Sequence, residues 1–318
     1  MKNRRTFIKK AALGAAAITI PANNMFGHLF PKTNPSMALP KISLAQWSLH
    51  RALEQGATKA VDFAGIAKNT YGIDAVEYVN QFYTDHAKDE PFWQEMKKRA
   101  DDAVVKSLLI MVDNEGDLGN PIDLERKTAV ENHYKWIDAA KILGCHSIRV
   151  NAFGQGNRSE IRAALISGLG LLAEYGTQAS INVIIENHGL HTSDAPFMVE
   201  IIKKVNSPFL GTLPDFGNWC LDTQWGSTQN DRCSNVYDRY KGVADFLPFA
   251  KGVSAKSYAF DAEGNETSID YPKMLRQVKD SSFEGHIGVE FEGENMAEPE
   301  GIRATKALIE RVWAALDE

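Results

Sequence analysis

Eight short apolar runs, each followed by a segment whose apolar residues recur at helical spacing, occupy the chain from about residue 40 to its end. The runs are rich in β-branched residues and are bounded by polar or glycine positions, which predicts buried strands. They cover residues 41–47, 73–80, 104–113, 146–152, 181–187, 210–218, 251–260 and 286–293. The helical patterns end near residue 69 after the first run, and then cover 90–103, 124–143, 160–179, 195–205, 235–247, 270–280 and 299–316.

Strict alternation of strand and helix predicts a parallel sheet with helices packed outside it. Eight such units in residues 40–318 have the count and size of a closed (β/α)8 barrel, which is typically about 250 residues long. An open doubly wound sheet is the alternative, but it usually carries a glycine-rich turn after its first strand. Here the first run continues into WSLH, and the later GQGNRS lacks a third glycine. We therefore predict an α/β fold, a single-domain TIM barrel.

The N-terminal segment differs in character from the rest of the chain. A basic stretch, NRRTFIKK, precedes the apolar run AALGAAAITI, which is typical of an export signal. The run is too short for a membrane-spanning helix of about 20 residues. Arg4 and Arg5, followed by Thr6 and Phe7, resemble a twin-arginine (Tat) signal, with a Sec signal or a tether as the alternative. We expect residues 1–39 to be signal and linker, the protein to be periplasmic, and no membrane span to remain afterwards.

The net charge of the remaining chain limits its partners. Residues 1–39 contain six of the 35 Lys and Arg and no acid, so 29 bases face 41 acids in the remainder, a formal charge of −12. Such an acidic body argues against a nucleic-acid partner. The oligomeric state stays open, a homo-oligomer included.

Three cysteines, Cys145, Cys220 and Cys233, are too few for a disulfide framework. Cys220 and Cys233 flank one polar stretch and could pair in an oxidising compartment, with three unpaired thiols as the alternative.

Polar residues follow the predicted strands where a TIM barrel has its active site, at the C-terminal ends. These residues are Gln46, Trp47, Glu77, Arg149, Asn151, Glu186, Asn187, His188, Asp215, Asn218, Ser254, Lys256, Tyr258, Glu290 and Glu292. Glu186, Asp215 and Glu290 come from three different strands and should converge. Taken singly, Asp215 could be a helix cap, His188 a surface histidine, and Glu292 could point outward.

Three carboxylates cannot share a pocket in ionised form without a counter-charge. One solution is a divalent cation such as Mn²⁺ or Mg²⁺, which prefers oxygen ligands. The other is a fixed cation, Lys256 or Arg149. Trp47 and Trp225 could stack on a sugar ring, although core packing is the commoner use of a tryptophan.

Four motifs resemble the xylose isomerase-like barrels, also described as sugar phosphate isomerases/epimerases: IIENHG, PDFGN, GVSAKSYAFD and IGVEFEG. The resemblance implies a divalent metal (Mn, Mg, Co or Zn) held by Glu, Asp, His and Glu from strands five to eight. Glu186, Asp215 and Glu290 match three of these ligands, and the two glutamates also match the acid/base pair of epimerases. Two positions depart from the pattern: Ser254 stands where many members have the histidine, and Asn218 where several epimerases have a substrate-binding histidine.

We expect an enzyme that acts on a small carbohydrate and moves a proton next to its carbonyl group. Glu186 and Glu290 would exchange the proton, while the metal or Lys256 would polarise the carbonyl. The expected substrate-binding residues are Trp47, Glu77, Asn151, His188 and Asn218. β-Elimination from a 3-keto-glycoside is a close variant. An exported sugar-binding protein without catalysis is the alternative from another class, and an endonuclease conflicts with the charge.

Overall fold

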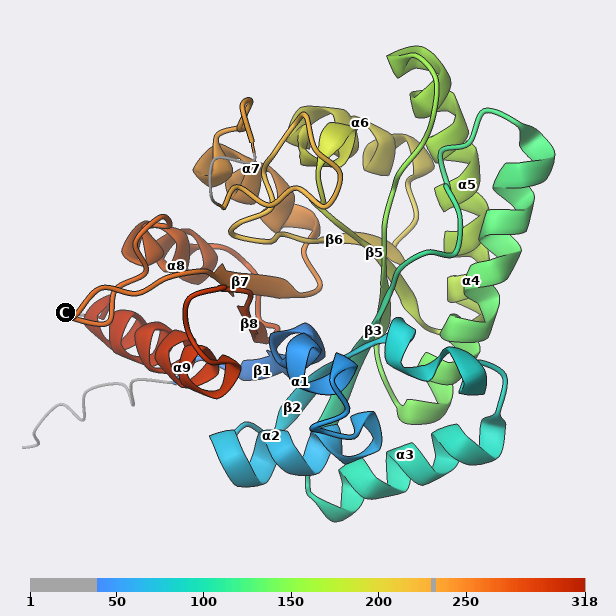
Figure 1. Ribbon diagram of the computed structural model, residues 1–318. Coiled ribbons are helices and arrows are strands. Elements are labelled where there is room, and N and C mark those ends of the chain that lie inside the picture. Colours follow the sequence, from blue (N-terminus) through green and yellow to red (C-terminus); the bar gives the residue numbers. More distant parts are fainter. Residues whose placement is uncertain (1–38, 230–232, 318) are drawn as a thin grey trace, which may run out of the picture. The chain divides into compact units, whose positions relative to one another are not determined.

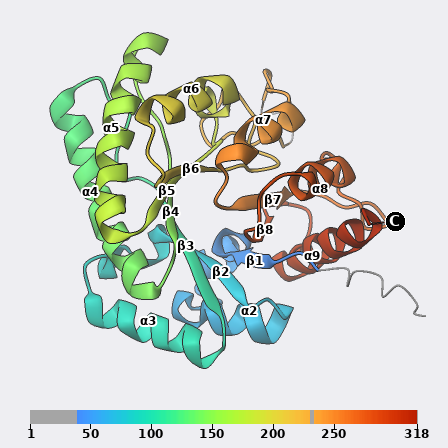
Figure 2. The same cartoon turned by 180° about the vertical axis from the view of Figure 1, so that it is seen from behind.

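A computed structural model describes residues 39–229 and 233–317, which excludes nearly all of the predicted export signal. Eight parallel strands curl around a central axis with the helices outside them (Figures 1 and 2). The strands are β1 (Ile42–Ala45), β2 (Ala75–Val79), β3 (Lys106–Val112), β4 (Ser147–Val150), β5 (Asn182–Glu186), β6 (Leu210–Leu213), β7 (Val253–Ser257) and β8 (Ile287–Phe291).

The sheet closes between its two edge strands. Continuous pairing runs in the order β6-β5-β4-β3-β2-β1-β8-β7. The remaining gap between β6 and β7 is bridged in parallel at Thr212 with Ala250 and at Asp215 with Ser254. Backbone hydrogen bonds accompany the second bridge, from the Phe216 N–H to the Ser254 carbonyl and from the Ser254 N–H to the Pro214 carbonyl. The predicted (β/α)8 barrel is confirmed.

Helices follow every strand in the described chain. They are α1 (His50–Glu54), α2 (Phe63–Tyr71), α3 (Glu90–Asp102), α4 (Asp123–Leu143), α5 (Arg158–Ala179), α6 (Ala195–Val205), α7 (Arg239–Phe246), α8 (Tyr271–Asp280) and α9 (Glu298–Ala315). Local sequence sets many of their ends. A capping box formed by Asn157 and Glu160 starts α5, and left-handed Gly144 ends α4.

Some predicted boundaries are too long. The strand predicted over 41–47 ends at Ala45, because Gln46–Leu49 forms a 3-10 helix. The run 251–260 contains the shorter strand β7, and the helix predicted over 235–247 begins at Arg239. The two strand errors include the C-terminal ends of β1 and β7, where the chain leaves the sheet to build the barrel mouth. None of the described helices is long and apolar enough to cross a membrane.

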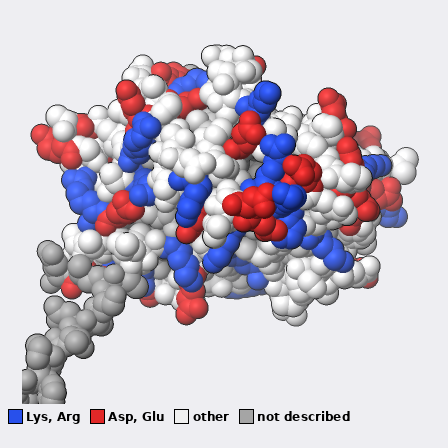
Figure 3. Space-filling model, turned by 90° about the horizontal axis from the view of Figure 1, so that it is seen from below, with Lys and Arg blue, Asp and Glu red and all other residues white. Residues whose placement is uncertain are grey.

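Charged side chains are mixed on the face drawn in Figure 3. Basic and acidic groups lie side by side there, without a continuous basic tract among the described residues in view. Such a mixed face offers no focused attraction for a polyanion.

Candidate active site

The two-residue alternation of strands decides which side chains reach the barrel interior. In β7, Val253 and Ala255 pack in the hydrophobic core beneath the helices, so Ser254 and Lys256 point the other way. In β8, Val289 and its apolar neighbours occupy the same core, which turns Glu290 inward. Apolar and charged residues therefore alternate along strands that are buried on both faces.

Lys256 is clamped between two carboxylates at the mouth of the barrel. Its Nζ lies 3.0 Å from Glu290 Oε1 and 3.0 Å from Glu292 Oε2, and its side chain is 2% exposed. Burial alone would lower the pKa of Lys256, but these two carboxylates raise it well above its ordinary value. The ammonium is therefore a permanent positive charge. Glu292 also accepts the Trp47 indole N–H at 2.8 Å, so it points into the mouth rather than outward.

Arg149 supplies the second buried cation. Its Nε lies 2.9 Å from Glu186 Oε2, and its NH1 donates to Asp113 Oδ1 at 2.5 Å. The other Glu186 oxygen accepts the Asn218 amide at 3.1 Å. Burial raises the pKa of Glu186 to about 7, even though the Arg149 charge acts in the opposite direction. A carboxyl group tuned to this range can accept and return protons near neutral pH.

Asp215 is held by the turn that follows β6. One carboxylate oxygen accepts the backbone N–H groups of Gly217 and Asn218, both at 2.7 Å. The Asn187 side chain joins this turn to the end of β5: it accepts the Asp215 N–H at 2.8 Å and donates to the Asp215 carbonyl at 3.1 Å. Asn187 thus fixes the spacing between Asp215 and its neighbour Glu186.

Ser254 bridges two carboxylates. Its Oγ lies 2.5 Å from Asp215 Oδ2 and 2.7 Å from Glu290 Oε2. A hydroxyl group has one proton and can donate to only one of them. The second contact therefore needs a proton from one of the two carboxyl groups. Burial raises the pKa of Asp215 to about 8, so this carboxyl group can supply the proton near neutral pH.

His188 presents a neutral imidazole in a defined orientation. Asn151 donates its amide N–H to Asp113 at 2.6 Å, which leaves its oxygen to accept from His188 Nδ1 at 2.7 Å. Burial and the Arg149 charge lower the pKa of His188 to about 3. With the proton on Nδ1, the lone pair on Nε2 is available to a ligand.

A cavity of about 700 Å³ opens above these groups. Four of the predicted site residues line it: Trp47, His188, Lys256 and Glu290. Four further predicted residues are buried and do not border the cavity: Glu186, Asp215, Asn151 and Asn218. Asn151 bonds to His188 and Glu186 pairs with Arg149, so these two hold residues of the lining in place. Arg149, Asp113 and Glu292 also line the cavity.

Glu77 is placed differently from the other predicted substrate contacts. It is 1% exposed inside the barrel and is absent from the cavity lining in the described chain. Ser43 donates to its Oε1 at 2.6 Å, while Oε2 has no hydrogen-bond partner among the described residues. Burial raises the pKa of Glu77 to about 8, so this carboxyl group is protonated at neutral pH.

The donor set fits a divalent cation. Glu186, Asp215 and Glu290 each offer one oxygen, and these atoms lie within 4.8 Å of one another. Five acidic side chains (Asp113, Glu186, Asp215, Glu290 and Glu292) surround two fixed cations, so the acidic groups outnumber the basic ones. Burial is the main cause of the raised pKa values of Glu186 and Asp215, and the nearby Glu290 raises both further, so a bound cation would oppose both effects. Ser254 makes the available donors all oxygen, the set preferred by Mg²⁺ and Mn²⁺.

One important residue, Asp113, escaped prediction as a site member, and a second, Glu292, was left with two alternatives. Asp113 ends the third apolar run, but a single aspartate after a strand reads as a loop residue. Glu292 was expected either in the site or pointing outward, and the alternation with Glu290 was the signal that favours the inner face. Both act by holding a cation, Arg149 or Lys256, that the sequence had identified as a possible counter-charge.

Several proteins similar to this chain are named as carbohydrate-modifying enzymes. The alpha subunit of 3'-dehydrocarminate deglycosidase from Microbacterium sp is 22% identical over 323 aligned positions, which span 81% of this chain and 90% of that protein. The structure of 3-keto-D-glucoside 4-epimerase YcjR from E. coli has a TM-score of 0.62 at 14% identity and covers 86% of this chain and 99% of its own. A xylose isomerase-like protein from Mycobacterium smegmatis in complex with magnesium has a TM-score of 0.61 at 15% identity, covering 87% and 97%.

These structural likenesses, at such low identity, establish the fold. The family assignment comes from the sequence itself, since residues 66–312 match one family along most of the chain. The protein belongs to the xylose isomerase-like TIM barrel family.

Proposed function

We propose that the protein is a metal-assisted enzyme that transfers a proton at the carbon next to a carbonyl group of a sugar derivative. Isomerase or epimerase chemistry is the leading form, and β-elimination is the close alternative. The observation that carries the proposal is Glu290: a carboxylate on the cavity wall, with Lys256 3.0 Å from one oxygen and Ser254 2.7 Å from the other.

Glu290 is positioned to take the proton. Its two contacts fix the carboxylate plane, and it borders the cavity in which a substrate would lie. Lys256 has three N–H donors, and Glu290 and Glu292 account for two of them. The third can reach a substrate oxygen and stabilise the negative charge that develops on the carbonyl when the proton leaves.

Glu186 is the partner for return of the proton. It projects from β5, whereas Glu290 projects from β8, so the two carboxyl groups approach the site from different sides of the barrel. The pKa of about 7 lets Glu186 exist in either form near neutral pH. His188 lies 3.9 Å from Glu186 and can orient a substrate hydroxyl through Nε2.

Glu186, Asp215 and Glu290 are the residues that would hold the metal, with Ser254 adjacent. A bound divalent ion would supply Lewis-acid polarisation of the carbonyl group.

The relative from Microbacterium and the E. coli epimerase are both named for oxidised glycosides, so we propose a 3-keto-glycoside as the substrate class. Export to the periplasm, proposed from the N-terminal sequence alone, favours glycosides over sugar phosphates.

Proton exchange in heavy water tests the proposal. Methyl 3-keto-β-D-glucoside is incubated with the metal-loaded protein in D₂O, and NMR follows loss of the proton signals beside the carbonyl. We expect exchange, with a new epimer as product for an epimerase or with released methanol for a lyase. Glu290→Gln should reduce exchange by at least about 10²-fold. Glu284→Gln, an exposed position just before β8, is the matched control and should behave as wild type.

Two outcomes would redirect the assignment. Tight binding of keto sugars without exchange under Mn²⁺, Mg²⁺, Co²⁺ or Zn²⁺ would support a sugar-binding protein instead. Metal content is measured in parallel by mass spectrometry, and Asp215→Ala should lose the ion that the wild type retains. A wild type that takes up no divalent ion would contradict the metal-assisted mechanism.

A further inference from the structure

The cavity has a wall that the proton-transfer chemistry does not use. Residues from the segment between β6 and α7 line it, namely Thr223, Gln224, Trp225, Ser227 and Gln229. All five carry no charge, whereas the reactive end contains Arg149, Lys256, Glu290 and Glu292. The cavity therefore has a charged end and an uncharged aromatic end.

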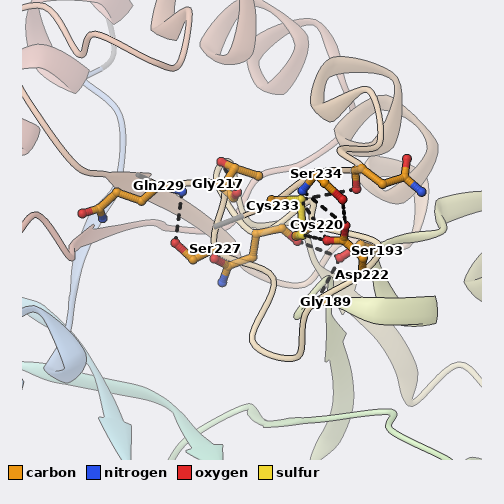
Figure 4. The surroundings of a disulfide bond; sticks show 12 residues. Gly189, Ser193, Gly217, Cys220, Asp222, Ser227, Gln229, Cys233 and Ser234 are labelled. Carbon is orange, nitrogen blue, oxygen red and sulfur yellow. Dashed lines mark hydrogen bonds between the residues drawn. A yellow bond between two sulfur atoms is a disulfide. The ribbon is translucent and has the colours of Figure 1, made fainter. Parts of the chain in front are cut away.

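The uncharged wall is rigidly attached to the barrel. A disulfide joins Cys220, which is fully buried, to Cys233, and so closes the segment into a ring (Figure 4). The sequence left open whether these two cysteines pair, and the structure joins them. Asp222 accepts hydrogen bonds from Ser234 beside the disulfide. The wall is thus cross-linked at its base.

The segment also crosses directly over the end of β5. The Leu190 N–H donates to the Thr223 carbonyl at 3.2 Å, and Gly189 pairs with Gln224. A Cβ at Gly189 would lie 2.1 Å from the Thr223 oxygen, and Gly189 has a φ of +95°. Glycine is required there because the segment packs on its backbone. The same β5 terminus that presents His188 therefore also anchors the wall.

Trp225 is the large side chain that this attached segment places at the cavity. Its φ is +71°, a left-handed conformation that is disfavoured for a large residue and recurs at functional sites. The residue is 41% exposed although it borders a cavity. Its ring lies edge-on to His188, with centroids 5.0 Å apart at 75°, and edge-on to Phe153 at 5.6 Å and 87°. Both aromatic neighbours therefore support the indole in one orientation.

Trp47 is engaged at the charged end instead. Its indole N–H is bonded to Glu292, and its ring stacks on His50 with centroids 4.6 Å apart. A cavity of about 700 Å³ lies within the range of roughly 300–1,000 Å³ that holds drug-sized ligands, and is more than one sugar ring requires.

We propose that Trp225 forms a second subsite that binds a planar aromatic aglycone, by stacking, while the sugar occupies the charged end. Uncharged Gln224 and Ser227 suit the hydroxyl or ether substituents of such a group. This inference rests on the proposed function for the sugar end only. It makes the natural substrate an aryl glycoside rather than a free monosaccharide, and it makes Trp225 a specificity-determining residue.

Binding of unreactive probes tests the subsite without requiring turnover. Phenyl β-D-glucoside, methyl β-D-glucoside and cellobiose lack the keto group, so their affinities for the full chain with Mn²⁺ can be measured by titration calorimetry. We expect the wild type to bind the phenyl glucoside about tenfold more tightly than the methyl glucoside, in keeping with the strength of an aromatic pair. Trp225→Ala should remove this preference, whereas Trp225→Phe should keep most of it.

Val236→Ala is the matched control, because Val236 is an exposed apolar residue of the same segment outside the cavity lining. It should leave the phenyl preference intact. Equal affinities in the wild type, no measurable binding of the phenyl glucoside, or a preference that survives in Trp225→Ala would overturn the proposal. Tighter binding of cellobiose than of the phenyl glucoside would overturn the aromatic class and indicate a second sugar site. A phenyl preference without proton exchange on keto sugars would leave the subsite standing while the proposed reaction fails.

Discussion

Replacement of Glu77 by glutamine should remove a large part of the pH dependence of stability. Glu77 is fully buried, and only one of its carboxylate oxygens has a hydrogen-bond partner in the described structure. Burial raises its pKa from 4.5 to about 8. Between these two pH values, the folded protein keeps a proton that the unfolded chain has lost. The stability that this retained proton contributes is thus complete below about pH 4.5. It decreases as the pH rises from 4.5 to 8, and none of it remains well above pH 8.

The magnitude follows from the size of the shift. A difference of about 3.5 pKa units at about 1.36 kcal/mol per unit corresponds to roughly 5 kcal/mol, as an upper limit. For a barrel of this size, 1 kcal/mol changes the melting temperature by roughly 2 °C. Because glutamine stays neutral, and because pH 5 to pH 8.5 spans most but not all of this titration, the melting temperature of Glu77→Gln relative to wild type should rise by up to about 8 °C between these pH values.

Circular dichroism melts of both proteins with EDTA present provide the measurement. Glu54→Gln, an exposed position on α1, is the matched control and should show no such pH-dependent difference. Glu77→Gln should also retain ligand binding, because Glu77 lies outside the cavity lining. An equal shift in melting temperature at pH 5 and at pH 8.5 would refute the reasoning, because it would mean that Glu77 does not gain a proton on folding.

Three further predictions concern the metal, the buried cation and the disulfide. Ser254→His should increase Zn²⁺ affinity relative to Mn²⁺ affinity by about tenfold or more in calorimetric titrations, because imidazole suits zinc while an all-oxygen set suits harder ions. An unchanged affinity ratio would place Ser254 outside the ligand shell. Lys256→Met should lower the rate of proton exchange by about 10²-fold, because it removes the positive charge beside Glu290, while the protein still takes up metal. Unimpaired exchange would show that Lys256 has a structural role only. The double variant Cys220→Ser/Cys233→Ser should lower the free energy of unfolding by about 3 kcal/mol, and a reducing agent should lower the melting temperature of the wild type alone. Equal melting temperatures for the wild type and the double variant would exclude a stabilising disulfide.

Much of the fold could be predicted because strand and helix periodicities are local properties. The eight βα units, their order and the inward direction of Glu290 all follow from residue spacing. The boundary errors at Gln46 and in 251–260 arose where buried residues, such as Gln46 and Tyr258, continue past the end of the strand. Apolar composition reports burial there rather than strand pairing.

The candidate site was predictable in outline for the same reason. Because parallel strands end at one face of a barrel, residues at their C-terminal ends converge wherever they lie in the chain. Convergence does not determine hydrogen bonding, however. The sequence left Lys256 and Arg149 as interchangeable counter-charges, while the structure pairs Lys256 with Glu290 and Glu292, and Arg149 with Glu186.

The sequence by itself determined the barrel, the family motifs and the three carboxylates that meet at the mouth. Only the tertiary structure decided the depth of each group: Glu290 reaches the cavity, Asp215 lies behind it, and Glu77 is sealed below. The tertiary structure also placed Trp225 over the end of β5. The physical reason is that depth and orientation depend on contacts between segments far apart in the chain, which local periodicity does not encode.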